Sequence, residues 1–498
     1  MRGFSLPGVR RPLATAGTAA AATAFVIGFS LLARDQPLIA VAIPFVLLFA
    51  VGCIRWPAAA VTGLIAISGT YGSLTAFGIL PAGPMVDLIL SALLAGTILS
   101  QLLGVRDRPW WIWPGVAILV LYVAITFLEI ATAANLGLGI KSFSYQAWYM
   151  LLVPLLALAG WSLPTYMRIY RSLLAVAVFV AGYAVFRKLA GPAASEQALG
   201  LRSAGVFNTV GGDLKLLGSF PNRHELAFWV TTAAPFAFAV MLIDPRKSWK
   251  MPAAFTMAGC VAAAYATDVR AALPALIAGG GAVIVLNQIA GRGKVLAQTV
   301  ASLAIAATVG AVLFTVIVGP DSSRYGAILN PSGDVSYQSH LTKWTAAIQD
   351  LHGHPFGLGL GTAGRLAEQG AGPFITEGTY AIDSSYLKIA YEQGFPVLVL
   401  FAIAIIALLV ELMRRSVRAR SPGVRALAIG ASGALMAAIP MWVTGQYMES
   451  LDTLFLWISI GAAIGAISAE RAQAMREGPA QQPSAPPVPE PLPADQRA

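Results

Sequence analysis

Charged side chains are scarce in this sequence. Only 11% of the 498 residues are Asp, Glu, Lys or Arg, whereas 57% are hydrophobic, and the mean hydropathy is +0.71. A soluble globular domain carries about 25% charged residues, so this chain lacks the polar side chains needed to cover a protein in water. The deficit excludes a set of soluble domains and predicts an all-α polytopic membrane protein.

Cysteine and histidine are also rare, with two and four residues. Cys53 and Cys260 lie in apolar stretches, which excludes a disulfide framework. His352 and His354 are close together, but no third ligand stands nearby at a recognised spacing, so we expect no metal. The glycines that follow lack the spacing and the βαβ context of a dinucleotide loop, and we expect no cofactor.

Long apolar segments make up most of the chain. A membrane-spanning helix needs about 20 mostly apolar residues. We predict about fourteen such helices, near residues 14–33, 37–53, 57–75, 85–104, 110–131, 146–163, 168–188, 224–243, 251–267, 271–289, 297–318, 384–411, 423–444 and 452–468.

Positive charge is unevenly divided between the predicted loops. With the N-terminus inside, the short inside loops hold fifteen Lys and Arg residues, and the short outside loops hold only Arg34, Lys141 and Arg270. Cytoplasmic loops of membrane proteins collect Lys and Arg, so the net charge of +10 reflects topology and not a nucleic-acid partner. We expect a multi-pass protein of the cytoplasmic (inner) membrane with both termini in the cytoplasm.

The predicted helices divide the chain into six regions. They are N-terminal transmembrane helices (1–188), a first extracytoplasmic loop (189–223), central transmembrane helices (224–318), a large extracytoplasmic loop (319–383), C-terminal transmembrane helices (384–468) and a disordered Pro-rich cytoplasmic tail (469–498). Connections as long as the large loop are usually functional or disordered, and this one should contain short helices. We therefore look for chemistry on the outer face.

The first loop ends in Gly218-Ser219-Phe220-Pro221-Asn222, followed by Arg223-His224-Glu225. Pro and Asn predict a turn before a helix, and the free N–H groups at a helix N-terminus favour an anion. One interpretation is a site for a phosphate or pyrophosphate headgroup. The other is that the charged side chains simply extend into solvent at the membrane surface. Arg202, earlier in the loop, leaves the same two interpretations open.

A second motif, Thr267-Asp268-Val269-Arg270-Ala271, forms a very short outside turn with an acid and a base. Asp268 and Arg270 either pair with each other or leave the guanidinium free for phosphate, which Arg binds in a bidentate manner. Both interpretations remain open from the residues alone.

The large loop contains an amphipathic helix over Tyr337–Leu351, since its apolar residues recur at three- and four-residue spacing. We expect this helix to lie on the bilayer or to cap a cavity. The loop ends at Asp383. If Asp383 caps the next helix, Tyr386 lies on one face of it, while Lys388 and Glu392 lie toward another and pair.

These stretches, in this order on the outer face of a polytopic chain, resemble the O-antigen ligase and polymerase superfamily over roughly residues 195–470. The resemblance rests on Gly218–Asn222 with Glu225-Leu226-Ala227, on Thr267–Ala271, on the Trp344 helix running into Pro355-Phe356-Gly357-Leu358-Gly359-Leu360-Gly361, and on Asp383-Ser384-Ser385-Tyr386-Leu387 with Glu392 and Gly394.

The resemblance implies a metal-independent membrane glycosyltransferase at the outer face of the membrane. Such proteins take a saccharide from an undecaprenyl-diphosphate carrier in the membrane lipid and pass it to a saccharide or lipid acceptor, and other polysaccharide-assembly proteins are candidate partners. By position, Arg270 and either Arg202 or Arg223 would hold the diphosphate. Asp383 stands where ligases have a histidine that assists the attacking hydroxyl, which favours polymerases of capsule or exopolysaccharide.

We therefore expect Asp383 and Arg270 to be catalytic. The residues expected to bind substrate are Arg202, Asn222, Arg223, His224, Tyr386 and His354. The main alternative is a lipid-linked oligosaccharide flippase or other transporter, which should carry charges near the membrane midplane. A cell-wall glycan polymerase of the shape and division family is a further enzymatic alternative.

Overall fold

The structure is a computed structural model that describes residues 48–78, 82–102, 113–133, 135–210, 213–291, 335–364, 382–448 and 450–477. Its elements are α3 (Pro57–Ala76), α4 (Ala82–Leu102), α5 (Pro114–Leu128), η2 (Glu129–Thr132), α6 (Leu136–Gln146), η3 (Trp148–Leu151), α7 (Leu152–Leu158), α8 (Leu163–Ala190), α9 (Ala194–Asn208), β1 (Thr209–Val210), β2 (Asp213–Leu214), α10 (Arg223–Ile243), α11 (Lys247–Ala266), α12 (Ala272–Gly291), α15 (Val335–Gly353), α17 (Ser385–Gln393), α18 (Phe395–Ser416), α19 (Pro422–Thr444), η5 (Leu451–Thr453) and α20 (Leu454–Glu477).

The described part of the chain is almost entirely helical, with one antiparallel pair of two-residue strands. Eight of its helical segments are long and apolar enough to cross a membrane. They coincide with eight of the fourteen predicted spans. Two further predicted spans, 85–104 and 146–163, match shorter apolar helices at Gly83–Leu99 and Trp148–Leu158. The fold therefore agrees with an α-helical polytopic membrane protein.

The remaining predicted spans do not add candidates. The predicted span 251–267 is helical as part of α11, but α11, which begins with Lys247, is not among the eight. The predicted spans 14–33 and 297–318, and most of 37–53, lie outside the described residues. The total of about fourteen therefore stays a prediction.

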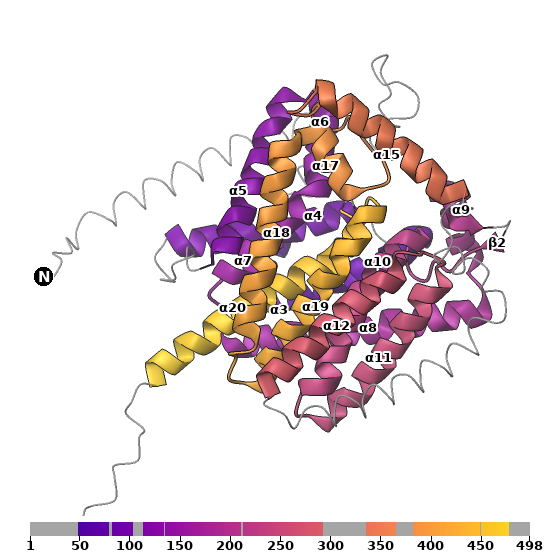
Figure 1. The fold of residues 1–498 in the computed structure, drawn as a ribbon. Coiled ribbons are helices and arrows are strands. Elements are labelled where there is room, and N and C mark those ends of the chain that lie inside the picture. The colour runs from indigo at the N-terminus through magenta and orange to yellow at the C-terminus, as the bar shows by residue number, and fades with distance from the viewer. Residues whose placement is uncertain are drawn as a thin grey trace, which may run out of the picture.

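Three helices form the centre of the bundle (Figure 1). The apolar windows of α10, α19 and α20 are 89%, 78% and 94% buried, whereas those of α5 and α18 are only 33% buried. Small residues let the central helices approach closely, since a Cβ on Gly433 would lie 2.9 Å from the Cβ of Pro235 on α10. The peripheral helices thus present apolar side chains outward, as lipid contact requires.

The predicted span 384–411 is wrong at its start, because two helices occupy it. α17 ends at Gln393 and α18 begins at Phe395, with Gly394 between them at a φ of +87°. That left-handed conformation suits glycine, and a Cβ there would lie 2.5 Å from the backbone carbon of Phe356. A hydropathy window averages over the amphipathic α17 and the apolar α18, so it does not mark this break.

One end of the bundle gathers the segments that carry the sequence motifs. The N-terminus of α10 contacts the turn between α11 and α12 through Arg223 and Thr267, and it contacts the segment after α19 through His224 and Tyr447. The helix predicted over Tyr337–Leu351 is confirmed as α15, which runs across the upper part of the view in Figure 1. We call this the α15 end of the bundle.

The end of the first loop is docked against α3. The backbone N–H of Ser73 donates to the Ser219 carbonyl at 3.1 Å, and the Ser219 hydroxyl donates to the Gly69 carbonyl. Gly72 permits this contact, because a Cβ there would lie 2.4 Å from the carbonyl carbon of Phe220. The packing fixes the approach of the chain to α10.

We predict that Gly72→Ala destabilises the protein, because the added methyl group must displace the backbone of Phe220. Overpacking of this kind typically costs about 1–3 kcal/mol. Gly63→Ala is the matched control on the same helix, since nothing lies within 4 Å of its Cβ position. Thermal unfolding of the detergent-purified variants, followed by tryptophan fluorescence, should show a lower midpoint for Gly72→Ala alone. Equal midpoints would contradict the docking described above.

Candidate active site

Two backbone N–H groups at the N-terminus of α10 are bound by protein side chains. Asn222 is the N-cap: its side-chain oxygen accepts from the backbone N–H of Glu225 at 2.9 Å, and its amide donates to the Glu225 carboxylate at 2.6 Å. The backbone N–H of Arg223 donates to the side chain of Asn208 at 3.1 Å. Asn222 therefore has a capping role, and phosphate binding at this end would depend on cationic side chains.

Arg223 joins the first loop to the second motif. Its guanidinium donates to the carbonyls of Thr267 at 3.2 Å and Asp268 at 3.4 Å, and the residue is only 8% exposed. The carboxylate of Asp268 lies 3.7 Å from the ammonium group of Lys215, also from the first loop. These contacts bring the turn that carries the half-exposed Arg270 next to Arg223, so two of the predicted arginines come from adjacent segments.

Asp268 has an unusual backbone conformation. Its φ is +60°, a left-handed conformation that non-glycine residues rarely adopt, although Asp tolerates it better than most. Two carbonyl contacts from Arg223 and one ion pair from Lys215 hold the turn in this shape. Strained conformations of this kind are frequent at functional sites.

Asp383 does not cap α17. Ser384 occupies the N-cap position, where its hydroxyl accepts from the backbone N–H of Leu387. The carboxylate of Asp383 instead faces α15, with one oxygen 3.3 Å from Nδ1 of His340 and 3.5 Å from Nζ of Lys343. The sequence interpretation misplaced the cap by one residue, because Ser and Asp are both good N-caps and two neighbouring candidates cannot be ranked from the sequence.

The environment of Asp383 keeps its carboxyl group ionised. Burial by itself raises the pKa of Asp383, but the hydrogen bond from His340 and the positive charge of Lys343 together outweigh burial, so the pKa lies below its ordinary value of 3.8. Asp383 remains 28% exposed, and His340 and Lys343 are 35% and 31% exposed. A carboxylate that is charged and reachable can accept a hydrogen bond from a substrate hydroxyl.

Tyr447 links the two halves of the α15 end and was not predicted from the sequence. Its hydroxyl lies 3.3 Å from Nδ1 of His224, and its ring stacks on Phe228 with centroids 5.4 Å apart. Burial raises the pKa of Tyr447, the charge of Arg223 opposes that shift, and the charges of Asp452 and Asp383 add to it. The tyrosine hydroxyl thus lies within electrostatic reach of groups from both predicted motifs.

The segment around Tyr447 is held beside Asp383 by its backbone neighbours. The backbone N–H and hydroxyl of Ser385 both donate to the Gly445 carbonyl, at 3.2 and 2.8 Å. The side-chain amide of Gln446 donates to the Ile382 carbonyl. Residues on both sides of Asp383 are therefore fixed to the segment that carries Tyr447.

Two other residues predicted to bind substrate lie apart from this cluster, and the side chain of a third is outside the described part of the structure. Tyr386 packs against Phe401 and Trp442, and its hydroxyl donates toward the Ile439 carbonyl at 3.4 Å, so it belongs to the helix packing. His354 directly follows α15 and is exposed, with Nδ1 3.3 Å from the carbonyl of Asp350 in that helix. Arg202 lies on α9, but its side chain is outside the described part of the structure.

The predicted pair of Lys388 and Glu392 is confirmed, at 3.4 Å and almost fully buried. The Glu392 carboxylate also accepts hydrogen bonds from the backbone N–H groups of Gly361 and Ala363, at 3.0 and 3.2 Å, and from the Ser142 hydroxyl on α6 at 3.0 Å. The glycine-rich stretch after α15 therefore wraps the C-terminal end of α17. Its role is to attach the large loop to the bundle.

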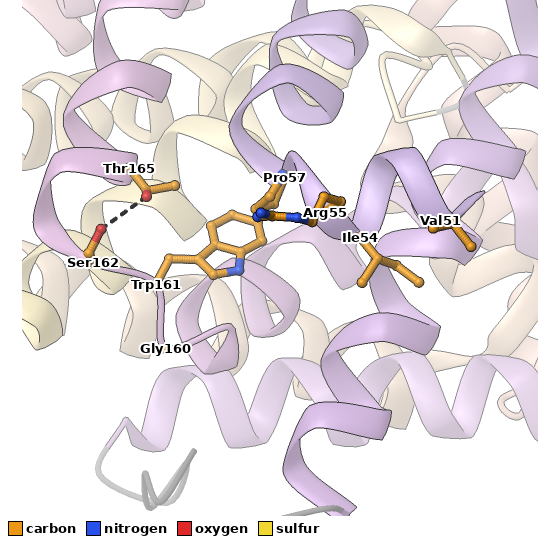
Figure 2. A pocket seen from close by; sticks show the side chains of 8 residues that line it. All are labelled: Val51, Ile54, Arg55, Pro57, Gly160, Trp161, Ser162 and Thr165. Atoms are coloured by element: carbon orange, nitrogen blue, oxygen red, sulfur yellow. Dashed lines mark hydrogen bonds between the residues drawn. The ribbon is translucent and has the colours of Figure 1, made fainter. Parts of the chain in front are cut away.

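One cavity in the described part of the chain lies at the opposite end of the bundle. Figure 2 shows this space of about 500 Å³, lined by residues that include Arg55, Trp161, Ser162 and Thr165. It borders the first residues of α3 and α8, whereas the first loop contacts the last turn of α3. A helix of 20 residues is about 30 Å long, so this cavity is remote from Asp383 and takes no part in the candidate site.

We predict that Asp383→Asn loosens α15 at neutral pH, because it removes the negative partner of His340 and Lys343. Tryptic cleavage after Lys343 should become several-fold faster than in the wild type, while His352→Gln, exposed on the same helix, should leave the rate unchanged.

A carboxyl group with a lowered folded-state pKa stabilises the protein above its ordinary pKa and loses this effect as pH falls through the lowered value. The difference in thermal stability between wild type and Asp383→Asn should therefore persist above pH 3.8 and shrink below it.

Comparison with known protein families finds no match to this chain, and comparison with curated proteins finds none either. The resemblance to O-antigen ligases and polymerases thus stays an expectation that rests on the motifs themselves.

Proposed function

We propose that the chain is a membrane glycosyltransferase that polymerises or ligates undecaprenyl-diphosphate-linked oligosaccharide at the outer face of the cytoplasmic membrane. The observation that carries the proposal is the gathering of motif residues at one end of the bundle. Arg223 and His224, the turn at 267–270, and Asp383 come from distant parts of the chain. They supply a cationic region and an ionised carboxylate, the two features that transfer from a diphosphate requires.

In this proposal the cations stabilise the leaving group. When the bond between the sugar and the diphosphate breaks, negative charge grows on the departing phosphate. Fixed positive groups in a water-poor site lower the energy of that charge, and such electrostatic effects are usually the largest catalytic contribution. Arg270 and Arg223 are the proposed diphosphate ligands, because the contacts of Arg223 with Thr267 and Asp268 place them on adjacent segments.

Asp383 is the proposed partner of the acceptor hydroxyl. Its ionised carboxylate can accept the hydroxyl hydrogen bond, orient the oxygen for attack on the anomeric carbon, and receive the proton as the new bond forms. The lowered pKa keeps this group charged at neutral pH but makes it a weak base. Orientation is therefore its larger contribution, and His340 and Lys343 fix the carboxylate in place.

α15 is the proposed cover of the site. Its contact with Asp383 lies on one side, and its C-terminal end is fixed by Tyr391, whose hydroxyl donates to Asp350 at 2.7 Å. A helix held over the reacting groups limits the entry of water, which would otherwise hydrolyse the donor. The opposite end of the bundle carries five arginines at the end of α18, in the following turn and at the start of α19: Arg414, Arg415, Arg418, Arg420 and Arg425. This cluster supports a cytoplasmic location for that end.

The alternative to the proposed glycosyltransferase is a transporter of the lipid-linked oligosaccharide. Transporters place ionisable groups near the membrane midplane. In the described residues, the buried charged side chains are Glu196, Arg223, Glu225, Asp244, Lys388, Glu392, Asp452 and Glu470. Each lies in a short helix, in a loop or within two turns of a helix end. This distribution favours an enzyme at one face over a transporter.

The first test is product length with purified protein in lipid and undecaprenyl-diphosphate oligosaccharide as the only substrate. A ladder of longer carrier-linked products would establish a polymerase. Single transfer to an added acceptor would establish a ligase. No product with any acceptor would contradict the proposal and favour transport.

We predict that Arg270→Ala lowers the transfer rate by about 100-fold or more, the typical effect of removing one group that stabilises a developing negative charge. Lys188→Ala is the matched control, since Lys188 is an exposed cation at the last turn of α8, and its loss should leave the rate unchanged. Both variants should insert in the membrane in normal amount. A normal product from Arg270→Ala would remove this residue from the proposed site.

We also predict that the residue at position 383 sets the acidic limb of the rate profile. Asp383→Asn should lower the rate by about 10²–10⁴-fold, the usual range for an acid–base group. Asp383→His should keep partial activity but lose it at a higher pH than the wild type, because the ordinary pKa of histidine is about 6.5. Initial rates between pH 4 and 8 test this expectation, and coincident acidic limbs would exclude Asp383 from the proton transfer.

A further inference from the structure

The face of α15 that points toward the bundle has two different halves. Toward its C-terminus, Ala347 and Leu351 are fully buried against Ile382 and Tyr391. Toward its N-terminus, His340 and Lys343 contact Asp383 and remain about one-third exposed. The apolar half thus fixes the helix, and the polar half stays partly accessible to solvent beside the candidate catalytic carboxylate.

Trp344 lies on this same face. Residues three and four apart share one side of a helix, so Trp344 lies between His340 and Ala347 along it. Its ring centroid is 6.3 Å from that of His340. The tryptophan therefore stands directly beside the imidazole that binds the Asp383 carboxylate.

The indole of Trp344 has a buried N–H without an acceptor in the described part of the protein. Other tryptophans of the bundle have one: the indole of Trp229 donates to Ser68 and that of Trp113 to Ser468, each at 3.3 Å. Most buried polar atoms in proteins are hydrogen-bonded. A buried donor next to partly exposed polar groups is where a bound molecule could supply the missing acceptor.

Trp442 provides the contrast. Its indole N–H also lacks an acceptor within the described residues, but the side chain is fully buried and surrounded by aromatic rings, including those of Trp457 and Phe401. No ligand can reach it there. Trp344, on the other hand, is half-buried and neighbours the partly exposed Asp383, His340 and Lys343.

We propose that Trp344 contacts the saccharide, donating its indole N–H to a sugar oxygen and packing its ring against the C–H face of a pyranose. This inference rests on the proposed function and adds a specificity residue to it. A sugar ring offers both an oxygen acceptor and an apolar face, whereas a lipid chain offers no acceptor. Contact with Trp344 would bring a sugar hydroxyl toward the Asp383 carboxylate.

The test compares Trp344→Phe, which keeps an aromatic ring and removes the N–H, with Trp344→Leu, which removes both. We expect the KM for the oligosaccharide substrate to rise about tenfold in Trp344→Phe, the usual effect of losing one hydrogen bond from a buried donor, and to rise further in Trp344→Leu. The kcat and the acidic limb of the rate profile should stay unchanged in Trp344→Phe. Trp56→Phe, an exposed tryptophan just before α3, is the control and should match the wild type.

The outcomes separate this inference from the proposed function. An active wild type with an unchanged KM in Trp344→Phe would overturn the saccharide contact alone. A shifted acidic limb in that variant would also overturn it, because Trp344 would then act through His340 and Asp383. If the wild type transfers nothing, binding of the free oligosaccharide still decides: saccharide-induced fluorescence quenching that is lost in Trp344→Phe supports the contact, and quenching that persists overturns it.

Discussion

The arrangement of the α15 end depends on the carboxylate of Glu392. This single group accepts hydrogen bonds from the backbone of Gly361 and Ala363 and from the Ser142 hydroxyl, and it pairs with Lys388. It thereby joins α6, α17 and the chain that follows α15. A buried charge is tolerated only when its partners satisfy it, and here those partners are the segments that must stay together. The positions of Asp383 and α15 follow from this attachment.

The candidate site adds a second set of attachments at the same end. Arg223 binds the carbonyls of the turn between α11 and α12, and Ser385 binds the Gly445 carbonyl after α19. Each contact joins segments that are distant in the sequence, and each uses a backbone carbonyl as acceptor. The result is a group of polar side chains whose geometry is set by the ends of several helices and not by one flexible loop.

The sequence predicted the parts of this structure that depend on local pattern. The periodicity of apolar residues predicted α15, and the four-residue spacing predicted the pair of Lys388 and Glu392, because both features depend on the helix repeat alone. The break at Gly394 was missed, since hydropathy averages over both helices. The cap was assigned to Asp383 and not to Ser384, because local preference for the two residue types is nearly equal.

The contacts of the site could not be predicted in the same way. His340 and Lys343 lie about 40 residues before Asp383, and Tyr447 follows an apolar helix in a segment without any recognised motif. Which of these groups meet is decided by how α15 packs against α17 and how α17 packs against α19. Asn222 and Tyr386 were both predicted to bind substrate. In the structure, the side chain of Asn222 caps α10. Tyr386 makes its hydrogen bond and ring contacts within the helix packing.

The burial of the central helices has a consequence for the surrounding bilayer. Arg223 begins α10 and Tyr447 follows α19, and the apolar windows of these helices are 89% and 78% buried, so they have little contact with lipid. A change in membrane thickness acts first on the peripheral helices, which tilt or shift to match it. Arg223, His224 and Tyr447 adjoin the ends of these inner helices and are thereby insulated from such hydrophobic mismatch.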